Sequence, residues 1–321
     1  MSTATILITD HAWPDLAIER QIIQSAGFRL VAGPAAPASA ARIGELVRAH
    51  QPETVLTCWA PVDAAAIAAS GNLRHVGRIG VGLDNIDTVA CAARNIVVTN
   101  VPDYCVEEVS DHALGFALAW TRGLVAFDRA VRAGSWQPAD ARLRRLCALQ
   151  VGIVGHGRIG AATARKFAAL RCKVRVHTRS VPAEPGGFEF VGLDTLLAAS
   201  DIVVLHVPLT AATQHLIDRD RLARMKPGAL LINVSRGGLV DSAAVADALE
   251  RGHLGGAALD VLESEPRVPP ALRELPGTLL TPHVAFSSDA SLTELRTRAA
   301  EEAVRLLRGE PPRHPCLPLS S

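Results

Sequence analysis

Several features that would point to particular classes of protein are absent from this sequence of 321 residues. There is no charge excess, since 33 Lys and Arg residues balance 32 Asp and Glu residues to a formal net charge of +1. The basic residues are also scattered, which argues against nucleic acid and against an anionic membrane surface as partners. The longest apolar stretch in a helical pattern, ALGFALAW, is too short to cross a bilayer.

Cysteine motifs and a secretory leader are also missing. The six cysteines occur singly, with no CxxC pair, at positions 58, 91, 105, 147, 172 and 316. This spacing is typical of reduced thiols and unlike a disulfide framework or a zinc site, so we expect no metal. The first residues, MSTATILITD, carry no basic segment and lead directly into a strand-like run. We therefore expect no signal peptide and a cytoplasmic location.

The sequence instead contains short β-rich runs that alternate with helical stretches. The runs are ATILIT, ETVLTCW, LRHVGRIGVG and NIVVTN in the first hundred residues, and VRVHTRS, DIVVLHVP, GALLINVS, LGGAALDV and TLLTPHVA after residue 149. This alternation predicts βαβ units and parallel sheets, and therefore an α/β fold. Runs such as IVVLHV are apolar at successive positions, as expected of strands buried between two helix layers.

Three segments stand outside this alternation. Residues 106–131 are apolar at helical spacing and predict one long helix or two joined helices, and residues 291–309 predict a helix near the end. The closing Pro-rich segment, 311–321, is expected to be irregular. Residues 106–131 are richer in Leu, Ala, Phe and Trp than one buried face requires. We therefore expect them to pack against a second copy in a two-fold homodimer.

A glycine-rich loop follows the predicted strand of LQVGIVG. Gly155, Gly157 and Gly160 form the pattern G-x-G-x-x-G, in which the first glycine allows a tight turn and the second admits a pyrophosphate. The third lets the helix pack close to the strand. The pattern alone is weak, because glycine-rich turns are common. Here the preceding strand, the following helix and the next strand are all predicted, which favours dinucleotide binding over an incidental turn.

Three candidate catalytic side chains each follow a predicted strand. They are Arg236 in NVSRGGLVD, Glu265 in ALDVLESEP and His283 in LLTPHVA. Taken singly, each has an ordinary explanation: a surface arginine, a solvated glutamate and a core histidine. The carboxyl ends of parallel strands meet at one edge of a sheet, however, where ligands bind. The three residues together, beside a dinucleotide loop, predict an active site.

These motifs make the sequence resemble the D-isomer-specific 2-hydroxyacid dehydrogenase family, in particular its hydroxypyruvate and glyoxylate reductases. The resemblance extends over nearly the whole chain. The matching motifs are RIGVGLDNID (78–87), GHGRIG (155–160), HVPLTAAT (206–213), NVSRGGLVD (233–241), ALDVLESEP (258–266) and TPHVA (281–285).

The resemblance implies two Rossmann-like domains with doubly wound parallel sheets and an active site in the cleft between them. Residues 1–100 and 286–321 would form the substrate-binding or lid domain, and residues 101–285 the dinucleotide-binding domain. By the same resemblance Arg236 binds and polarises a 2-oxo acid, His283 is the acid/base, and Glu265 is its carboxylate partner. Imidazole suits proton exchange near neutral pH, and a planar guanidinium suits a carboxylate beside a carbonyl oxygen.

The remaining site residues are expected around these three. The expected substrate contacts include the backbone of Val81 and Gly82, where the alternative is a plain tight turn, and Trp59, where core packing is an equal alternative. The residues expected to bind the cofactor are Gly155, Gly157, Arg158, Ile159, Gly160, Thr178, Arg179, His206, Val207, Pro208, Thr213, Val234, Ser235, Arg236, Asp260 and His283. Those expected to bind the substrate are Cys58, Trp59, Val81, Gly82 and Arg236.

The end of VRVHTRS bears on the choice of cofactor. An acidic residue there would bind the ribose hydroxyls of NAD and repel a 2′-phosphate. The chain has Thr178 and then Arg179, and NAD-using members of the family usually carry aspartate in place of the threonine. We expect Arg179 to hold the phosphate of NADP, so that NADP is favoured over NAD. The alternative is a solvated loop arginine in an enzyme that takes either cofactor.

The sequence therefore predicts an NAD(P)-dependent 2-hydroxyacid dehydrogenase that acts mainly as a 2-oxoacid reductase. Glyoxylate, hydroxypyruvate and larger 2-oxo acids all remain open as substrates. The rival from another class is a corepressor-like scaffold that senses the cofactor, because fold does not fix function. A formate dehydrogenase is disfavoured, since that branch carries an amide where this chain has Glu265, and nothing calls for phosphite oxidation. Two positions depart from the family: Asp111 replaces a usual glutamate, and Ala148 replaces a common glycine.

Overall fold

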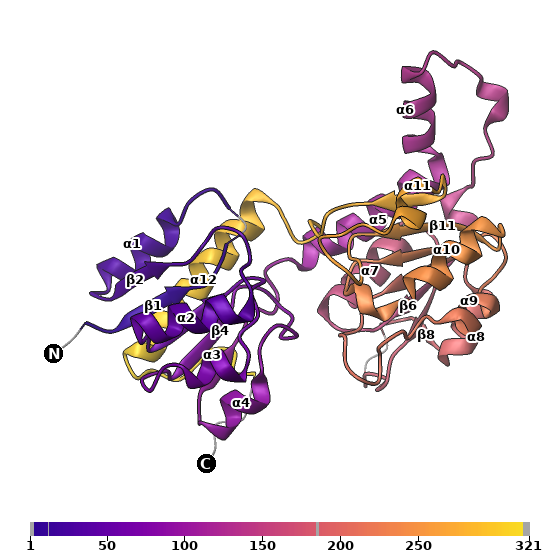
Figure 1. Ribbon diagram of the computed structural model, residues 1–321. Coiled ribbons are helices and arrows are strands. Elements are labelled where there is room, and N and C mark those ends of the chain that lie inside the picture. The colour runs from indigo at the N-terminus through magenta and orange to yellow at the C-terminus, as the bar shows by residue number, and fades with distance from the viewer. Residues whose placement is uncertain (1–2, 12, 184–185, 317–321) are drawn as a thin grey trace. The chain divides into compact units, whose positions relative to one another are not determined.

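The computed structural model describes residues 3–11, 13–183 and 186–316, which form two compact units (Figure 1). Unit 1 contains the chain up to Tyr104 and the part from Ser288 onward, and unit 2 spans Cys105–Ser287. The predicted boundaries, after residues 100 and 285, fall close to these points. The functional roles predicted for the two units remain predictions.

The described part of unit 1 is built on a five-stranded parallel sheet with the strand order β2-β1-β3-β4-β5. Its strands are β1 (Thr5–Ile8), β2 (Arg29–Ala32), β3 (Thr54–Thr57), β4 (His75–Arg78) and β5 (Val97–Thr99). Its helices are α1 (Ala17–Ser25), α2 (Ala40–His50), α3 (Ala64–Ala68), α4 (Thr88–Ala93) and α12 (Asp289–Leu307).

The core of unit 1 lies on both faces of this sheet. Leu7, Val55 and Val76 pack on one face with apolar residues of α2, α3 and α4. Successive strand residues point to opposite faces, so Ile6 and Ile8, which are also fully buried, face the other side. Helices α1 and α12 pack against each other, and α12 contacts β3 and β4. The last helix of the chain therefore belongs to the same core as the first strand.

The described part of unit 2 is built on a seven-stranded parallel sheet with the strand order β12-β11-β10-β9-β6-β7-β8. Its strands are β6 (Gln150–Val154), β7 (Lys173–His177), β8 (Glu189–Phe190), β9 (Ile202–Leu205), β10 (Ala229–Asn233), β11 (Leu254–Leu259) and β12 (Thr278–Leu280). The strand order reverses between β6 and β9, which is where dinucleotides bind in doubly wound sheets.

Helices cover both faces of this second sheet. Val203 and Leu205 pack in a cluster with residues of α8, α9, α10 and α11. The intervening residues Ile202 and Val204 are fully buried on the opposite face, where α5 and α7 pack together. The helices are α5 (Val106–Arg122), α6 (Leu124–Arg132), α7 (Arg158–Ala169), α8 (Leu193–Ala199), α9 (Arg219–Arg224), α10 (Ser242–Glu250) and α11 (Pro270–Glu274). Short 3₁₀ turns lie at Pro138–Asp140, Leu146–Ala148 and Gly237–Leu239.

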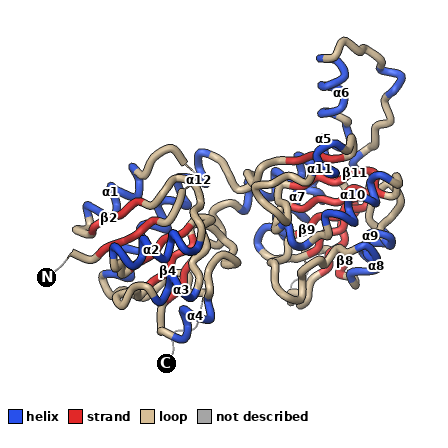
Figure 2. The backbone as a smooth tube through the Cα atoms, in the orientation of Figure 1, coloured by secondary structure: helices blue, strands red, loops and turns tan. Residues whose placement is uncertain are grey.

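The predicted α/β class with two parallel sheets is confirmed, and Figure 2 shows the strands gathered into one sheet in each unit. The predicted helical region 106–131 consists of two joined helices, because Gly123 adopts the left-handed conformation (φ 62°) between α5 and α6. Helix α6 has no buried residue, and it stands away from the sheet of its unit in Figure 1.

The ends of the predicted elements differ from the structure in several places. VRVHTRS is a strand only as far as His177. Residues 311–316 form neither helix nor strand, as expected of a Pro-rich segment, and residues 317–321 lie outside the described residues. In the part of the chain that the structure describes, no helix is both long enough and apolar enough to cross a membrane.

Candidate active site

The glycine loop connects β6 to the N-terminus of α7. Gly155 has a positive φ of 101°, and its N–H donates to the carbonyl of His177 at 2.8 Å, which ties the loop to the end of β7. A side chain at Gly160 would collide with the carbonyl oxygen of Gly155. A side chain at Gly157, in contrast, would meet no protein atom within 4 Å.

This arrangement fits a bound pyrophosphate. Two of the three glycines are required by the packing of the protein, whereas the third leaves the backbone open on the outer side. Gly157 is the N-cap of the 12-residue helix α7, and no side chain caps that end. Uncapped N–H groups at a helix N-terminus favour an anion. Arg158 and Ile159 form the first turn of the helix.

Thr178 and Arg179 follow directly after β7. Thr178 is half-buried and Arg179 is exposed. No side-chain hydrogen bond or ion pair joins Arg179 to another described residue, whereas Arg175 of the same strand pairs with Glu189 at 2.8 Å. The guanidinium of Arg179 is therefore not used by the fold around it.

The segment after β9 contributes His206, Val207, Pro208 and Thr213. The Nε2 atom of His206 is buried and has no hydrogen-bond partner among the described residues. Burial lowers the pKa of His206 to about 3, so this imidazole is neutral at physiological pH. Thr213 closes the following turn, because its Oγ1 accepts from the N–H of Thr210 at 2.8 Å and donates to the carbonyl of Pro208 at 2.7 Å.

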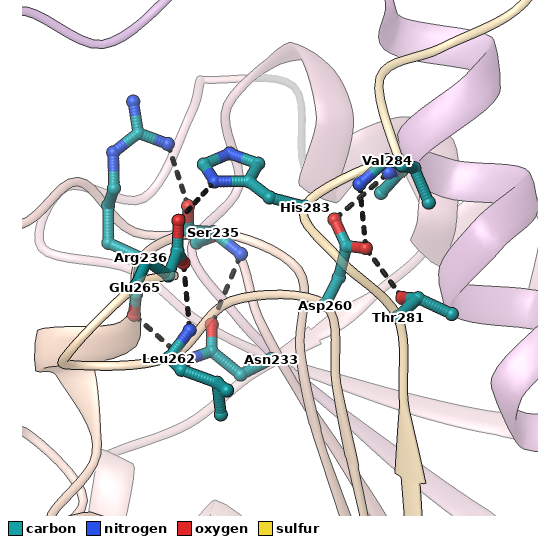
Figure 3. A network of polar contacts seen from close by, with 10 residues as sticks. Asn233, Ser235, Arg236, Asp260, Leu262, Glu265, Thr281, His283 and Val284 are labelled. Carbon is teal, nitrogen blue, oxygen red and sulfur yellow. Dashed lines mark hydrogen bonds and ion pairs between the residues drawn. The ribbon is translucent and has the colours of Figure 1, made fainter. Parts of the chain in front are cut away.

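The loop after β10 carries Ser235 and Arg236 (Figure 3). The side chain of Asn233 organises this loop, since its Nδ2 donates to the carbonyl of Arg236 at 2.8 Å and its Oδ1 accepts from the N–H of Ser235 at 3.1 Å. The Ser235 hydroxyl donates to the carbonyl of Leu205 on the neighbouring strand at 2.8 Å. Nη1 of Arg236 donates to the carbonyl of Ser235 at 2.7 Å. Val234 is buried.

Asp260 follows β11 and is 2 % exposed. Its Oδ1 accepts from the hydroxyl of Thr281 at 2.5 Å and from the N–H of Val284 at 2.9 Å, and its Oδ2 accepts from the N–H of Ala285 at 2.9 Å. These bonds fix the segment that follows β12, as Figure 3 shows. Each carboxylate oxygen can accept two hydrogen bonds. Oδ1 already accepts two hydrogen bonds from described residues and Oδ2 accepts one. A cofactor group predicted to bind Asp260 would therefore donate to Oδ2.

His283 and Glu265 form a hydrogen-bonded pair. Nδ1 of His283 lies 2.8 Å from Oε2 of Glu265, whose Oε1 accepts from the N–H of Leu262 at 2.8 Å. Partial burial alone would raise the pKa of Glu265, but the hydrogen bonds from His283 and Leu262 and the charge of Arg236 hold that pKa below its ordinary value. His283 has a positive φ of 54°, and its N–H donates to the carbonyl of Asp260 at 2.8 Å.

The structure thus brings together the three side chains that the strand ends predicted. Figure 3 shows the guanidinium of Arg236 on the same side of the loops as the pair of His283 and Glu265. The arrangement combines a cation that suits a carboxylate or carbonyl oxygen with an imidazole held in one orientation by a carboxylate. Among the described residues, no group of three His, Cys, Asp or Glu side chains is placed to hold a metal ion.

A second His–Glu pair beside this site was not predicted from the sequence. Nε2 of His215 lies 2.5 Å from Oε1 of Glu263, and Oε2 of Glu263 accepts from the N–H of Ser242 at 2.8 Å. The pair joins the segment after β9 to the segment after β11. His215 lies two residues after Thr213, and Glu263 two residues before Glu265, but no spacing rule indicates that they meet.

In unit 1 the predicted substrate residues lie at the ends of β3 and β4. Cys58, Trp59 and Ala60 donate their backbone N–H groups to the carboxylate of Asp10, at 3.1, 2.8 and 3.1 Å. Asp10 is fully buried and was not predicted as a site residue. Burial raises the pKa of the Cys58 thiol to about 12, so Cys58 is not a thiolate at neutral pH. Trp59 is half-buried.

The other unit 1 loop contains Val81 and Gly82, both half-buried. The carbonyl of Val81 accepts from Nδ2 of Asn100 at 2.7 Å, which orients this peptide. The two departures from the family lie elsewhere, in unit 2. Asp111 forms an ion pair with Nζ of Lys166 at 2.6 Å, and Ala148 ends a 3₁₀ turn just before β6.

Comparison with known proteins places the chain in a family. Residues 114–285, more than half of the chain, match the sequence profile described as "D-isomer specific 2-hydroxyacid dehydrogenase, NAD binding domain". The chain belongs to the D-isomer specific 2-hydroxyacid dehydrogenase family. The resemblance that the sequence motifs suggested is therefore confirmed.

Relatives and solved structures of this family differ in how much of their length the chain covers. The D-3-phosphoglycerate dehydrogenase of Mycobacterium tuberculosis is 39 % identical over 252 residues, which are 78 % of this chain but 48 % of that enzyme. The chain thus spans about half the length of that relative. The glyoxylate reductase of Thermofilum pendens is 37 % identical over 84 % of this chain and 82 % of its own length.

A solved structure extends the comparison to almost the full chain. The NADPH-dependent glyoxylate/hydroxypyruvate reductase of Sinorhizobium meliloti, in complex with NADP and malonate, superposes with a TM-score of 0.86. It is 32 % identical, and the superposition covers 98 % of this chain and 97 % of that one. These relatives are dehydrogenases and reductases, and none of them supports the alternative of a corepressor-like scaffold.

Proposed function

We propose that the protein is an NAD(P)-dependent 2-hydroxyacid dehydrogenase that works mainly as a 2-oxoacid reductase. The observation that carries this proposal is the 2.8 Å hydrogen bond between His283 and Glu265, beside Arg236 and at the sheet edge that also presents the glycine loop. Membership of the 2-hydroxyacid dehydrogenase family supports it, as do the named activities of the relatives.

In this proposal three side chains prepare the substrate for reduction. When bound, the nicotinamide cofactor supplies a hydride to C2 of the 2-oxo acid. Arg236 binds the carboxylate and polarises the carbonyl through its planar fork of N–H groups. His283 donates a proton from Nε2 to the carbonyl oxygen, because its Nδ1 is occupied by Glu265. Glu265 stays ionised, since its pKa is lowered, and so stabilises the imidazolium before transfer.

The residues that would hold the cofactor are those already described at the ends of β6, β7, β9 and β10. Gly155, Gly157 and Gly160 would carry the pyrophosphate at the N-terminus of α7. We propose that NADP is preferred over NAD, because Thr178 cannot repel a 2′-phosphate and Arg179 has no ion-pair partner among the described residues. The relative from Sinorhizobium meliloti is described as NADPH-dependent, in line with this proposal.

The proposed substrate is a small 2-oxo acid. In unit 1, the backbone N–H groups of Val81 and Gly82 would bind its carboxylate, and Trp59 would line the pocket. Glyoxylate and hydroxypyruvate are the first candidates, because relatives are named as reductases of these acids. The alternative is a larger 2-oxo acid, and a comparison of kcat/KM among 2-oxo acids would distinguish it from glyoxylate and hydroxypyruvate.

We also propose a homodimer and a cytoplasmic location. Support for the dimer comes from α6, which has an apolar stripe but no buried residue. Leu124 and Val131 of this helix are exposed and could pack against a second copy. On α5, Val109, Ala113, Phe116 and Ala117 are buried, so the exposed apolar surface of residues 106–131 lies mainly on α6. The six cysteines are all free thiols, which suits a reducing compartment.

The proposed function is tested by a screen of 2-oxo acids against NADH and NADPH, following the absorbance of the reduced cofactor. With the best substrate, His283→Ala should lower kcat by about 10²–10⁴-fold, the usual contribution of general acid–base catalysis. Cofactor affinity should stay within about twofold of the unmodified enzyme, because the imidazole meets the substrate. His50→Ala, at the end of α2, is the control. Full activity of His283→Ala would refute the mechanism.

A further inference from the structure

Arg78 is a buried cation at the end of β4. Its residue is 8 % exposed, and Nη1 donates to the carbonyl of the next residue, Ile79. Its positive charge also acts on the Cys58 thiol, whose pKa it lowers against the larger effect of burial. Nε has no hydrogen-bond partner, and no described carboxylate forms an ion pair with Arg78.

A buried arginine without a counter-ion is unusual, because the loss of hydration around a charge is costly unless the charge is paired. The nearby carboxylate of Asp10 does not fill this role. Its oxygens accept the backbone N–H groups of Cys58, Trp59 and Ala60 and the hydroxyl of Thr9. Asp10 is therefore held by groups of its own and neighbouring loops, and no described carboxylate pairs directly with Arg78.

That charge lies directly beneath the loop Gly80–Gly82. A Cβ atom placed on Gly80 would lie 2.5 Å from Nη1 and 2.8 Å from Cζ of Arg78, so the guanidinium packs against the backbone of Gly80. Gly80 also has a φ of 152°, a conformation that side chains rarely adopt. The glycine thus lets the cation pack against the first residue of the loop that continues into Val81 and Gly82.

We propose that Arg78 is a positioning residue whose buried charge strengthens the binding of the substrate carboxylate at the Gly80–Gly82 loop. The inference rests on the proposed function, in which Val81 and Gly82 hold that carboxylate. The carboxylate would then supply a counter-ion close to Arg78, which pairs directly with no described carboxylate. Arg78 would act through the loop and through its field, while the N–H groups make the direct contact.

A 2-oxo acid and its uncharged methyl ester together distinguish an effect of the Arg78 charge from a structural effect of the side chain. In Arg78→Met, kcat/KM for the best 2-oxo acid should fall roughly tenfold to a hundredfold, mainly through KM, as expected for loss of a charge-assisted interaction. For the methyl ester of the same acid, which carries no charge, kcat/KM should stay within about twofold. Arg74→Met, an exposed arginine just before β4, is the matched control and should change neither value.

Each other outcome decides against the proposal. If the acid and the ester lose kcat/KM in parallel, Arg78 has a structural role only, and unchanged values for the acid overturn it as well. If Arg78→Met does not fold, Arg78→Lys replaces it. That variant keeps the charge and should retain most of the preference for acid over ester, and loss of the preference would contradict the proposal.

If the unmodified enzyme reduces no 2-oxo acid, the proposed function fails. Calorimetric titration with oxamate then decides, and equal affinity in Arg78→Met and the unmodified protein overturns the inference.

Discussion

The cofactor preference can be tested at the end of β7. The carbonyl of His177, the last residue of the strand, accepts a hydrogen bond from the N–H of Gly155 at 2.8 Å. Thr178 is therefore the residue that directly follows this contact with the glycine loop. Removing the guanidinium in Arg179→Ala should lower kcat/KM for NADPH and leave that for NADH almost unchanged. Thr178→Asp should reverse the preference, because a carboxylate there accepts the ribose hydroxyls and repels a 2′-phosphate.

The magnitude follows from the surroundings of Arg179. Its side chain is exposed and has no partner among the described residues, so its removal breaks no contact of the folded protein. A hydrogen bond to a charged group contributes roughly 1.5–3 kcal/mol, and solvent screening of an exposed arginine favours the lower end. We therefore expect a loss of about tenfold for NADPH. Added salt should reduce the same preference in the unmodified enzyme.

The assay compares kcat/KM for NADPH and NADH at low and high salt in each variant. Arg158→Ala serves as the matched control, because Arg158 begins α7 at the proposed site of the pyrophosphate, which both cofactors share. That change should weaken the two cofactors equally. Comparable kcat/KM values for NADPH and NADH in the unmodified enzyme would refute the reasoning and make Arg179 an ordinary surface residue.

Three further predictions concern catalysis, assembly and stability. Arg236→Lys keeps the charge but loses the two-pronged geometry, so affinity for the 2-oxo acid and kcat should both fall at least about tenfold with Tm unchanged; a lower Tm with normal kinetics would indicate a structural arginine. Light scattering should give the mass of two chains at micromolar concentration, and Val131→Glu on α6 should give one chain; a single-chain mass for the unmodified protein would exclude the dimer. Burial lowers the pKa of His75 from 6.5 to about 3, so the unfolded chain binds a proton that the folded protein does not, and stability should fall as pH drops from about 6.5 toward about 3. His75 should contribute about 2 kcal/mol of this loss by pH 5 in urea unfolding, and an equal pH dependence in His75→Asn would contradict this origin.

The sequence predicted the central strands because burial on both faces leaves a continuous apolar run. Val203 and Val204 of β9 are neighbours that point to opposite faces, and both are fully buried. The strands that escaped prediction, β2 and β8, lie at the sheet edges. β2 has no fully buried residue and only three consecutive apolar residues, and β8 has only two residues, so neither shows the longer apolar run of a central strand.

The candidate site was predictable where topology alone brings residues together. Arg236, Glu265 and His283 lie after neighbouring strands of one parallel sheet, and the strand order guarantees that these ends converge. The supporting contacts could not be predicted in this way. The bonds of Asp10 reach residues 48 to 50 positions away, and His215 meets Glu263 48 positions away, through loop conformations that no local pattern specifies.

The two units use a buried aspartate in the same way. Asp10 follows β1 and binds the N–H groups of the segment after β3, while Asp260 follows β11 and binds those of the segment after β12. Neither carboxylate is needed as a reacting group. Each instead fixes a segment that carries predicted site residues, and in unit 2 the bonds hold His283 in a left-handed conformation that non-glycine residues seldom adopt.

Buried charges of opposite sign are therefore treated differently in this fold. Its buried anions at the sheet edges are satisfied by backbone N–H groups, and these bonds preorganise the loops before any ligand arrives. The buried cation Arg78, in contrast, donates to the carbonyl of Ile79 and pairs with no described carboxylate. A fold that satisfies the anions with its own donors and leaves the cation without a counter-ion is matched to a ligand that brings a negative charge. A 2-oxo acid is such a ligand, and its neutral ester is not.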